Sequence, residues 1–133
     1  MTRPMIALLA AASLAGCSYA PNPDRIAYNQ GEIAKELAGR TAEPVQRCLN
    51  RAFRESVREV GGKIFFSQGK TIYQMETTGI CTGLNRPTAY LASESFASSN
   101  LCEGDFVRIV DGNSAIPYSQ CTVEGFTPYS RAD

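Results

Sequence analysis

Cysteine is the residue type with the most distinctive chemistry in this chain of 133 residues. The sequence contains five cysteines, which are Cys17, Cys48, Cys81, Cys102 and Cys121. None of the last four forms the close C-x₂₋₄-C pair that is typical of a zinc site. In an exported protein, four thiols instead predict two disulfides, because compartments outside the cytoplasm are oxidising. Four cysteines allow three pairings. We expect Cys48 with Cys121 and Cys81 with Cys102, which would tie the ends of the domain together.

Cys17 differs from the others because it follows a short apolar segment at the N-terminus. Arg3 precedes the run MIALLAAASL at residues 5–14. This run is too short to span a bilayer as a helix, which needs about 20 residues. A basic residue followed by a short apolar run is typical of a secretory signal peptide. We therefore expect export, with residues 1–16 removed as the signal peptide.

The residues around Cys17 resemble the lipobox of bacterial lipoproteins. That motif places a large apolar residue and two small residues before an invariant cysteine, here Leu14, Ala15, Gly16 and Cys17. The resemblance implies that diacylglycerol is attached to the Cys17 thiol and that the chain is cut before it. Several acyl chains on one residue would make a stable anchor, since a single chain binds membranes only marginally. The alternative is a buried cysteine in an apolar helix.

The segment after Cys17 predicts a tether and then a helix. Ser18, not Asp, follows the cysteine. By resemblance to lipoproteins of enteric bacteria, this favours the outer membrane, with the protein facing the periplasm. Residues 17–30 contain two prolines and several turn formers, so we expect a lipidated tether there. Ile33 and Leu37 lie four positions apart, which predicts a short amphipathic helix over 31–37.

The chain has no histidine, and this limits the reactions that its side chains can perform. Ser-His-Asp and Cys-His catalysis within one chain are excluded, and the commonest metal ligand is missing. Glu103 and Asp105 could place two carboxylates together for acid–base or glycosidic chemistry, although a Gly-Asp turn explains the same residues. The segment DGNS at 111–114 lacks the further acidic ligands of a calcium loop and predicts a turn. We therefore expect no enzymatic activity, no metal and no cofactor.

The charge balance and the aromatic residues indicate which binding partners to expect. The 13 basic and 13 acidic residues balance, so nucleic acid is not expected as a partner. We expect the membrane, through the lipid on Cys17, and another envelope protein or a glycan. The serine-rich segment 93–100 is a candidate recognition loop. Five aromatic residues form either a platform for a sugar or peptide or a set of half-buried sheet residues; they are Tyr73, Tyr90, Tyr118, Phe126 and Tyr129.

From Lys63 onward the sequence is typical of short strands separated by Gly, Pro, Asn and Ser. The expected strands are 63–67, 70–75, 88–93, 105–111 and 120–126. This pattern predicts a single, mainly β domain over residues 31–133, folded as a small antiparallel β-barrel or sandwich.

Residues 49–60 allow two interpretations. Leu49, Phe53, Val57 and Val60 follow helical spacing. Alternatively, the two glycines at 61–62 close a hairpin between two strands. A row of arginines accompanies the helical spacing, and we expect it to be solvated; its members are Arg47, Arg51, Arg54 and Arg58.

Five segments resemble an uncharacterised family of small exported proteobacterial proteins, catalogued as a domain of unknown function. They are RCLNRAF, KIFFSQGKTIYQM, GICTGLNRP, SNLCEGDFVRIVD and SQCTVEGFTPY, between Arg47 and Tyr129. The family pattern falls on Cys48, Leu49, Tyr73, Cys81, Leu84, Leu101, Cys102, Asp105 and Cys121. The resemblance implies a β-rich domain and favours the hairpin at 53–60. The family has no assigned activity, so the resemblance implies no catalytic residues.

Together these features predict a lipid-anchored envelope protein that faces the periplasm and acts as a non-enzymatic binding or structural accessory module. The alternative is a small lipoprotein inhibitor of a lysozyme-like or other hydrolytic enzyme. The size, the disulfides and the serine-rich loop suit that alternative.

Overall fold

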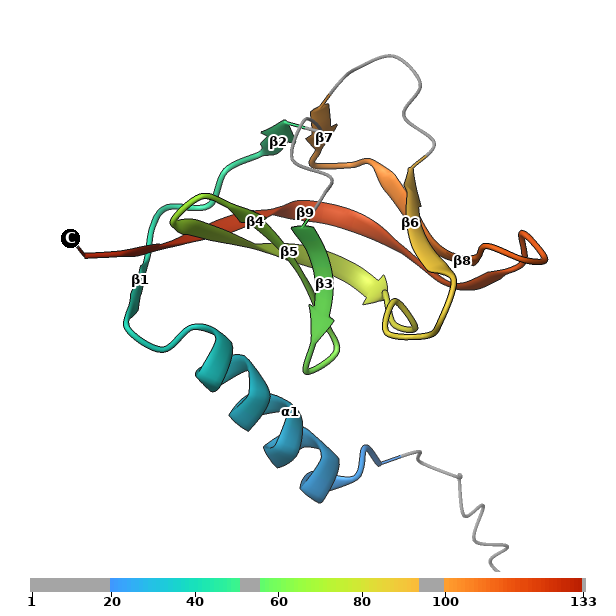
Figure 1. The fold of residues 1–133 in the computed structure, drawn as a ribbon, viewed down its shortest axis with the longest axis horizontal. Helices are drawn as coiled ribbons and strands as arrows, with labels where there is room; N and C mark the ends of the chain where they lie inside the picture. Colours follow the sequence, from blue (N-terminus) through green and yellow to red (C-terminus); the bar gives the residue numbers. More distant parts are fainter. Residues whose placement is uncertain (1–19, 51–55, 94–99, 133) are drawn as a thin grey trace, which may run out of the picture.

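The computed structural model of the chain describes residues 20–50, 56–93 and 100–132. Within that part of the chain there is one helix, α1 (Pro23–Glu36). The strands are β1 (Arg40–Ala42), β2 (Cys48–Asn50), β3 (Val57–Val60), β4 (Lys63–Gln68), β5 (Thr71–Ile80), β6 (Ala89–Ser93), β7 (Asn100–Cys102), β8 (Phe106–Asp111) and β9 (Pro117–Arg131). The predicted mainly β fold is confirmed, and the main sheet is an antiparallel half-barrel with the helix below it (Figure 1).

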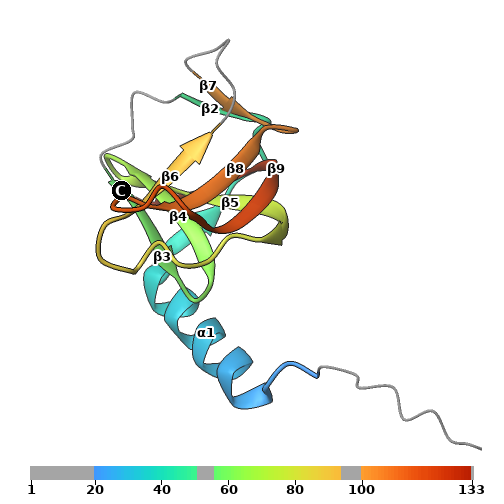
Figure 2. The same cartoon turned by 90° about the vertical axis from the view of Figure 1, so that its right-hand side faces the viewer.

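The main sheet has the strand order β3-β4-β5-β9-β8-β6. β9 is the longest strand, at 15 residues, and it pairs with β5, with β8 and, near the C-terminus, with β1. Register shifts follow Glu76 in the β5–β9 pair and Ile109 in the β8–β9 pair. Such bulges increase the local twist and bend a strand, so they favour a curled sheet. β2 and β7 form a separate ribbon at the end of the half-barrel remote from α1 (Figures 1 and 2).

The hairpin interpretation of the segment before residue 61 is confirmed for β3 and β4. Val57 pairs with Phe66, and Val60 pairs with Lys63. Gly61 and Gly62 form the turn, and both have positive φ angles, of 57° and 79°. A two-residue turn with positive φ at both positions matches the right-handed twist of the flanking strands, and glycine adopts it without steric cost. Residues 51–55 lie outside the described residues.

The helix begins earlier than the sequence analysis predicts. The Asn22 side chain accepts a hydrogen bond of 2.9 Å from the Asp24 backbone N–H, and Pro23 occupies the first helical turn. Asn before Pro and Asp is a helix start signal. The expected tether over 17–30 is therefore wrong for residues 23–30, which are helical. The predicted C-terminal end is confirmed, since Leu37 caps the helix.

The hydrophobic core lies on the concave face of the sheet. Its buried members are Leu49, Ile64, Phe66, Met75, Cys81, Leu101, Val107, Ile109, Cys121, Val123 and Phe126. Phe66 and Phe126 pack edge to face, with ring centroids 6.0 Å apart. Phe65 is also buried, but it pairs directly with Arg58, whose side chain binds Glu36 of α1. Because successive residues of a strand point to opposite faces, Phe65 lies on the side of the sheet towards α1.

The structure contains two disulfides, as predicted, but the expected pairing is wrong. Cys48 is bonded to Cys102, and Cys81 is bonded to Cys121. Cys48 lies directly opposite Cys102 in the β2–β7 ladder. Cys81 follows the end of β5, where Gly79 is in register with Cys121. The pairing of the strands, rather than a need to link the ends of the domain, decides which cysteines form each disulfide. Each disulfide stabilises the fold by about 2–4 kcal/mol.

Candidate functional site

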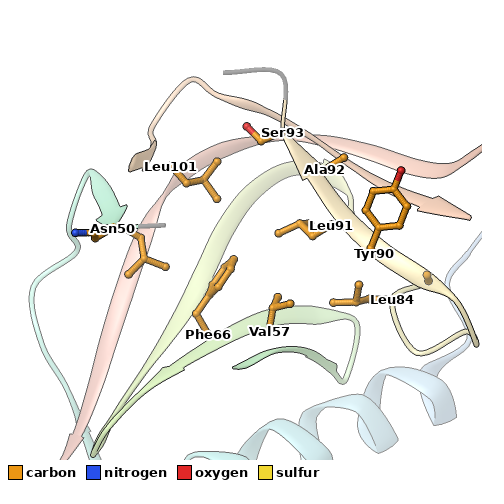
Figure 3. A pocket seen from close by; sticks show the side chains of 11 residues that line it. Asn50, Val57, Phe66, Leu84, Tyr90, Leu91, Ala92, Ser93 and Leu101 are labelled. Carbon is orange, nitrogen blue, oxygen red and sulfur yellow. The ribbon is translucent and has the colours of Figure 1, made fainter. Parts of the chain in front are cut away.

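An apolar groove opens on the concave side of the half-barrel, between the edge strands β3 and β6. It encloses about 540 Å³. Its lining residues, shown in Figure 3, are Leu49, Asn50, Val57, Phe66, Leu84, Ala89, Tyr90, Leu91, Ala92, Ser93 and Leu101. None of these side chains is charged. We call this feature the apolar groove.

The walls of the apolar groove are continuous with the core. Leu49 and Leu101 face each other across the β2–β7 ribbon and are buried. Phe66 is also buried, and Val57, its partner in the β3–β4 ladder, packs beside it. Leu91 completes the opposite wall from β6. The groove therefore exists because the curled sheet ends at two edge strands that do not pair with each other.

One end of the apolar groove is more polar than its centre. Asn50 and Ser93 lie at the end bounded by Leu101 (Figure 3). Both side chains are uncharged hydrogen-bonding groups. An elongated ligand with an apolar body and a polar end would match this distribution.

Glu59 fixes the loop that supplies one wall of the apolar groove. Its Oε2 atom accepts hydrogen bonds from the backbone N–H groups of Gly83, at 2.9 Å, and Leu84, at 2.8 Å. Ser119 holds the same loop, because its hydroxyl accepts from the Thr82 N–H and donates to the Thr82 carbonyl. Leu84 is therefore positioned by polar contacts to the backbone of its own loop.

A second hollow lies between α1 and the end of the sheet, and we call it the polar cleft. It encloses about 720 Å³. Four of its lining residues come from α1, namely Arg25, Tyr28, Asn29 and Glu32. The others are Glu59, Val60, Gly61, Gly62, Ile80, Thr82, Gly83, Asn85, Arg86 and Tyr118. The guanidinium carbon of Arg86 lies 4.3 Å from the centre of the Tyr118 ring, a cation–π contact.

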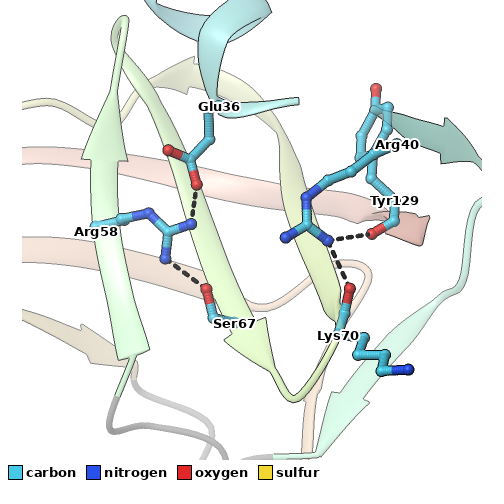
Figure 4. A network of polar contacts seen from close by, with 6 residues as sticks. All are labelled: Glu36, Arg40, Arg58, Ser67, Lys70 and Tyr129. Atoms are coloured by element: carbon cyan, nitrogen blue, oxygen red, sulfur yellow. Dashed lines mark hydrogen bonds and ion pairs between the residues drawn. The ribbon is translucent and has the colours of Figure 1, made fainter. Parts of the chain in front are cut away.

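Two contacts hold α1 against the sheet, and the polar cleft forms between the helix and the end of the sheet. A Cβ atom at Gly61 would lie 2.4 Å from the Asn29 carbonyl oxygen, so the helix packs directly on this glycine. Glu36 binds Arg58, which also donates to the Ser67 hydroxyl (Figure 4).

Arg40, just beyond the helix, ties the following segment to the sheet. Its Nη1 donates to the carbonyl oxygens of Lys70, at 2.5 Å, and Tyr129, at 3.4 Å (Figure 4). Partial burial, together with the charge of Arg131, lowers the pKa of the Arg40 guanidinium.

The candidate carboxylate pair is engaged in structural contacts. Glu103 forms an ion pair of 2.8 Å with Arg47. The Asp105 carboxylate accepts a 2.7 Å hydrogen bond from the Cys102 N–H, across a turn in which Gly104 has a φ of 90°. The turn interpretation is therefore confirmed.

The segment 111–114 is also a turn. The Asp111 carboxylate accepts hydrogen bonds from the Asn113 N–H and from the hydroxyls of Ser114 and Thr88. These bonds, the Asn113 N–H first, lower the pKa of Asp111. Within the three described ranges, no three His, Cys, Asp or Glu side chains cluster so as to hold a metal ion.

The five candidate aromatic residues do not form one platform. Phe126 is fully buried, and Tyr73 packs against the core. Tyr90 lines the apolar groove, whereas Tyr118 lines the polar cleft. Of the serine-rich segment, residues 94–99 lie outside the described residues, as do Arg51 and Arg54 of the arginine row. Arg47 and Arg58 of that row are ion-paired.

The sequence analysis did not single out Tyr28, Ile80 or Arg86 as site residues. The first lies in the segment predicted to be a tether. The other two lie in GICTGLNRP, where the family pattern falls only on Cys81 and Leu84. Among the described residues, no helix is long and apolar enough to cross a membrane. Cys17 and the segment that resembles a lipobox lie outside the described residues.

Comparison of the chain with protein-family models, with curated proteins and with solved structures found no match. The resemblance to an exported family of unknown function therefore stays a prediction. The function must be inferred from the residues and their arrangement.

Proposed function

We propose that this protein is a lipid-anchored, non-enzymatic binding module of the bacterial envelope that holds an apolar ligand in the apolar groove. The lipobox-like residues ending at Cys17 support the anchor, and Ser18 after the cysteine supports the periplasmic side of the outer membrane as its place. The observation that carries the binding role is an open groove in a disulfide-bonded sheet, lined by uncharged and mainly apolar side chains.

The dimensions and chemistry of the groove favour a single acyl chain or a similar elongated amphiphile. Its volume of about 540 Å³ falls within the range of roughly 300–1,000 Å³ that is usual for small-molecule sites. Apolar surface buried by a ligand contributes about 25 cal/mol per Å². A charged body would lose its hydration without gaining a partner, since none of the described lining side chains is charged.

The binding proposal is tested with cis-parinaric acid, a fluorescent acyl chain, and the mature protein. We expect saturable fluorescence enhancement that Leu91→Trp abolishes, because the larger ring would fill the groove. Ile116→Trp is the matched control, since Ile116 is exposed and lies outside the groove. Enhancement that survives Leu91→Trp in a folded protein would contradict the proposal. Protection of peptidoglycan from lysozyme by a protein without probe binding would instead support the inhibitor alternative.

The anchor is tested separately by Cys17→Ser. We expect the wild-type protein to carry acyl chains, detected by mass spectrometry, and to sediment with membranes. The variant should accumulate as an unacylated precursor. Normal acylation and membrane retention of the variant would contradict the anchor.

A further inference from the structure

The polar cleft gathers the most exposed apolar side chains of the described residues. Ile80 is 71% exposed and Tyr28 is 68% exposed, the highest values among the large hydrophobic residues there. Both line the polar cleft. Because exposed apolar groups that gather at one place mark interaction sites more often than scattered ones, this placement calls for a partner with an apolar component.

Two positive charges accompany these apolar side chains. Arg25 and Arg86 line the polar cleft, and neither forms an ion pair within the part of the chain that the structure describes. The carboxylates of the cleft are already engaged. Glu32 is paired with Lys35 at 2.8 Å, and Glu59 accepts two backbone hydrogen bonds. Both guanidinium groups therefore lack a carboxylate partner among the described residues, although Arg86 also stacks on Tyr118, and this favours an anionic partner.

The position of α1 in the chain identifies this partner. If Cys17 is acylated, as the proposed function requires, only six steps of chain separate it from Pro23. Fully extended, this segment spans at most about 20 Å. The first turns of α1, which carry Arg25 and Tyr28, are thus held close to the lipid surface. Arginine with tyrosine and aliphatic side chains is the combination that binds the interface of an anionic membrane.

We infer that the polar cleft is a membrane-docking face. Tyr28 and Ile80 enter the interfacial region of the bilayer, while Arg25 and Arg86 contact lipid phosphates. The docking orients the domain, because α1 and the β2–β7 ribbon lie at opposite ends of the molecule (Figures 1 and 2). The ribbon end of the apolar groove then points away from the membrane that carries the anchor.

The chain contains no tryptophan, so a single introduced tryptophan reports its own surroundings. The acylated protein with Tyr28→Trp is reconstituted into vesicles of phosphatidylglycerol and phosphatidylcholine. We expect a blue-shifted emission that is quenched by lipids brominated on their acyl chains. The control is Phe106→Trp, an exposed aromatic position at the start of β8, beside the β2–β7 end. Its emission should be the same with and without vesicles, and it should resist quenching.

Charge removal tests the arginines. Arg25→Gln and Arg86→Gln, each combined with Tyr28→Trp, should lower the docked-to-undocked ratio, measured from tryptophan emission, by roughly fivefold. Arg131→Gln is the matched control, because Arg131 is exposed on β9 and does not line the cleft. Added salt should also lower the docked-to-undocked ratio, and so should the use of vesicles made of phosphatidylcholine alone.

The result that overturns this inference is water-like emission from the acylated, vesicle-bound Tyr28→Trp protein. Equal blue shifts in the Tyr28→Trp and Phe106→Trp proteins would also overturn it, since no single face would then be docked. Failure of the proposed anchor is distinguishable, because the protein would lack the acyl mass and would not sediment with vesicles. Circular dichroism of each variant checks that the fold is kept.

Discussion

The apolar groove and the polar cleft share the β3–β4 hairpin but are built in different ways. Val57 and Phe66 of the hairpin face the apolar groove, whereas Glu59 and the turn glycines face the polar cleft. The groove is walled by strands whose side chains continue into the core. The cleft has one wall from α1, a helix without a single buried residue.

This difference means that the two sites depend on different parts of the fold. The apolar groove persists as long as the sheet is folded. The polar cleft depends on the packing of α1 against Gly61 and on the Glu36–Arg58 ion pair. Because neither contact is part of the sheet ladder, the cleft can open while the sheet stays intact. Substitutions in the core, in the β2–β7 ribbon, in the shared hairpin and at the contact between α1 and Gly61 test whether the two sites are independent.

The largest effect is expected from Phe126→Ala, which should disrupt both sites. Phe126 is fully buried and packs against Phe66, a wall of the apolar groove. Truncating a buried phenylalanine costs about 3–5 kcal/mol of unfolding free energy, because a cavity remains. Urea unfolding followed by circular dichroism measures the loss. A loss below about 1 kcal/mol would contradict this account of the core.

Removing the Cys48–Cys102 bond should weaken the apolar groove selectively. Replacing both cysteines by Ala should lower the unfolding free energy by about 2–4 kcal/mol. It should also loosen the β2–β7 ribbon, which carries Leu49 and Leu101. We expect weaker cis-parinaric acid binding but, with Tyr28→Trp added, unchanged tryptophan emission on vesicles. An equal loss of cis-parinaric acid binding and of the tryptophan emission shift on vesicles would contradict the independence of the two sites.

Glu59→Ala should affect both sites, because Glu59 lies in the polar cleft and holds the loop of Leu84. Two backbone N–H groups would lose their partner, at a cost of about 1–3 kcal/mol. Thermal unfolding and probe binding should both decline. Glu124→Ala is the control, since Glu124 is exposed and lines neither site. An unaltered probe affinity in Glu59→Ala would contradict the positioning role.

Gly61→Ala should open the polar cleft and spare the apolar groove. The new methyl group would overlap the Asn29 carbonyl, and its φ of 57° is strained for alanine, so we expect a loss of about 1–3 kcal/mol. Gly69→Ala is a close control, because its φ is 55° and no atom lies within 4 Å of the added carbon. Faster hydrogen exchange over α1 in Gly61→Ala, but not in Gly69→Ala, is the expected result. Equal exchange rates would mean that α1 does not rest on Gly61.

The smallest effect is expected from pH, through Asp111, which lines neither site. Its hydrogen bonds lower its pKa in the folded protein, so the unfolded state binds more protons in the acid range. Its contribution to stability is therefore present above the unfolded pKa of about 3.9 and is lost as pH falls through the lower, folded pKa. Asp111→Ala should flatten the dependence of Tm on pH between roughly 5 and 3. An identical slope in wild type and variant would contradict this assignment.

Local chemistry was enough to predict much of the sheet. Two consecutive glycines at 61–62 allowed the β3–β4 hairpin, because few other residues adopt positive φ at both turn positions, but local periodicity also allowed a helix, and the family resemblance favoured the hairpin. Gly-Asp at 104–105 predicted the turn in which the Asp105 carboxylate accepts from the Cys102 N–H. The start of α1 was also encoded locally, in Asn22-Pro23-Asp24, but the two prolines of that segment were interpreted as a linker.

The disulfide pairing and the two hollows were not predictable, because they depend on which strands become neighbours. Cys48 meets Cys102 only because β2 pairs with β7 in that register. Likewise, Arg25 and Arg86 come to one cleft only after α1 packs on the β3–β4 turn. No local pattern of one segment carries this information.

By itself, the sequence determined the mainly β class, the number of disulfides and the turn at 104–105, and it predicts a lipid anchor. Each of these depends on interactions within a few neighbouring residues or on the number of thiols. Only the tertiary structure decided which cysteines pair, that the sheet stays open between β3 and β6, and that Tyr28, Ile80 and two arginines line one cleft. These features arise from long-range strand register and helix packing, which are set by the burial of the whole core.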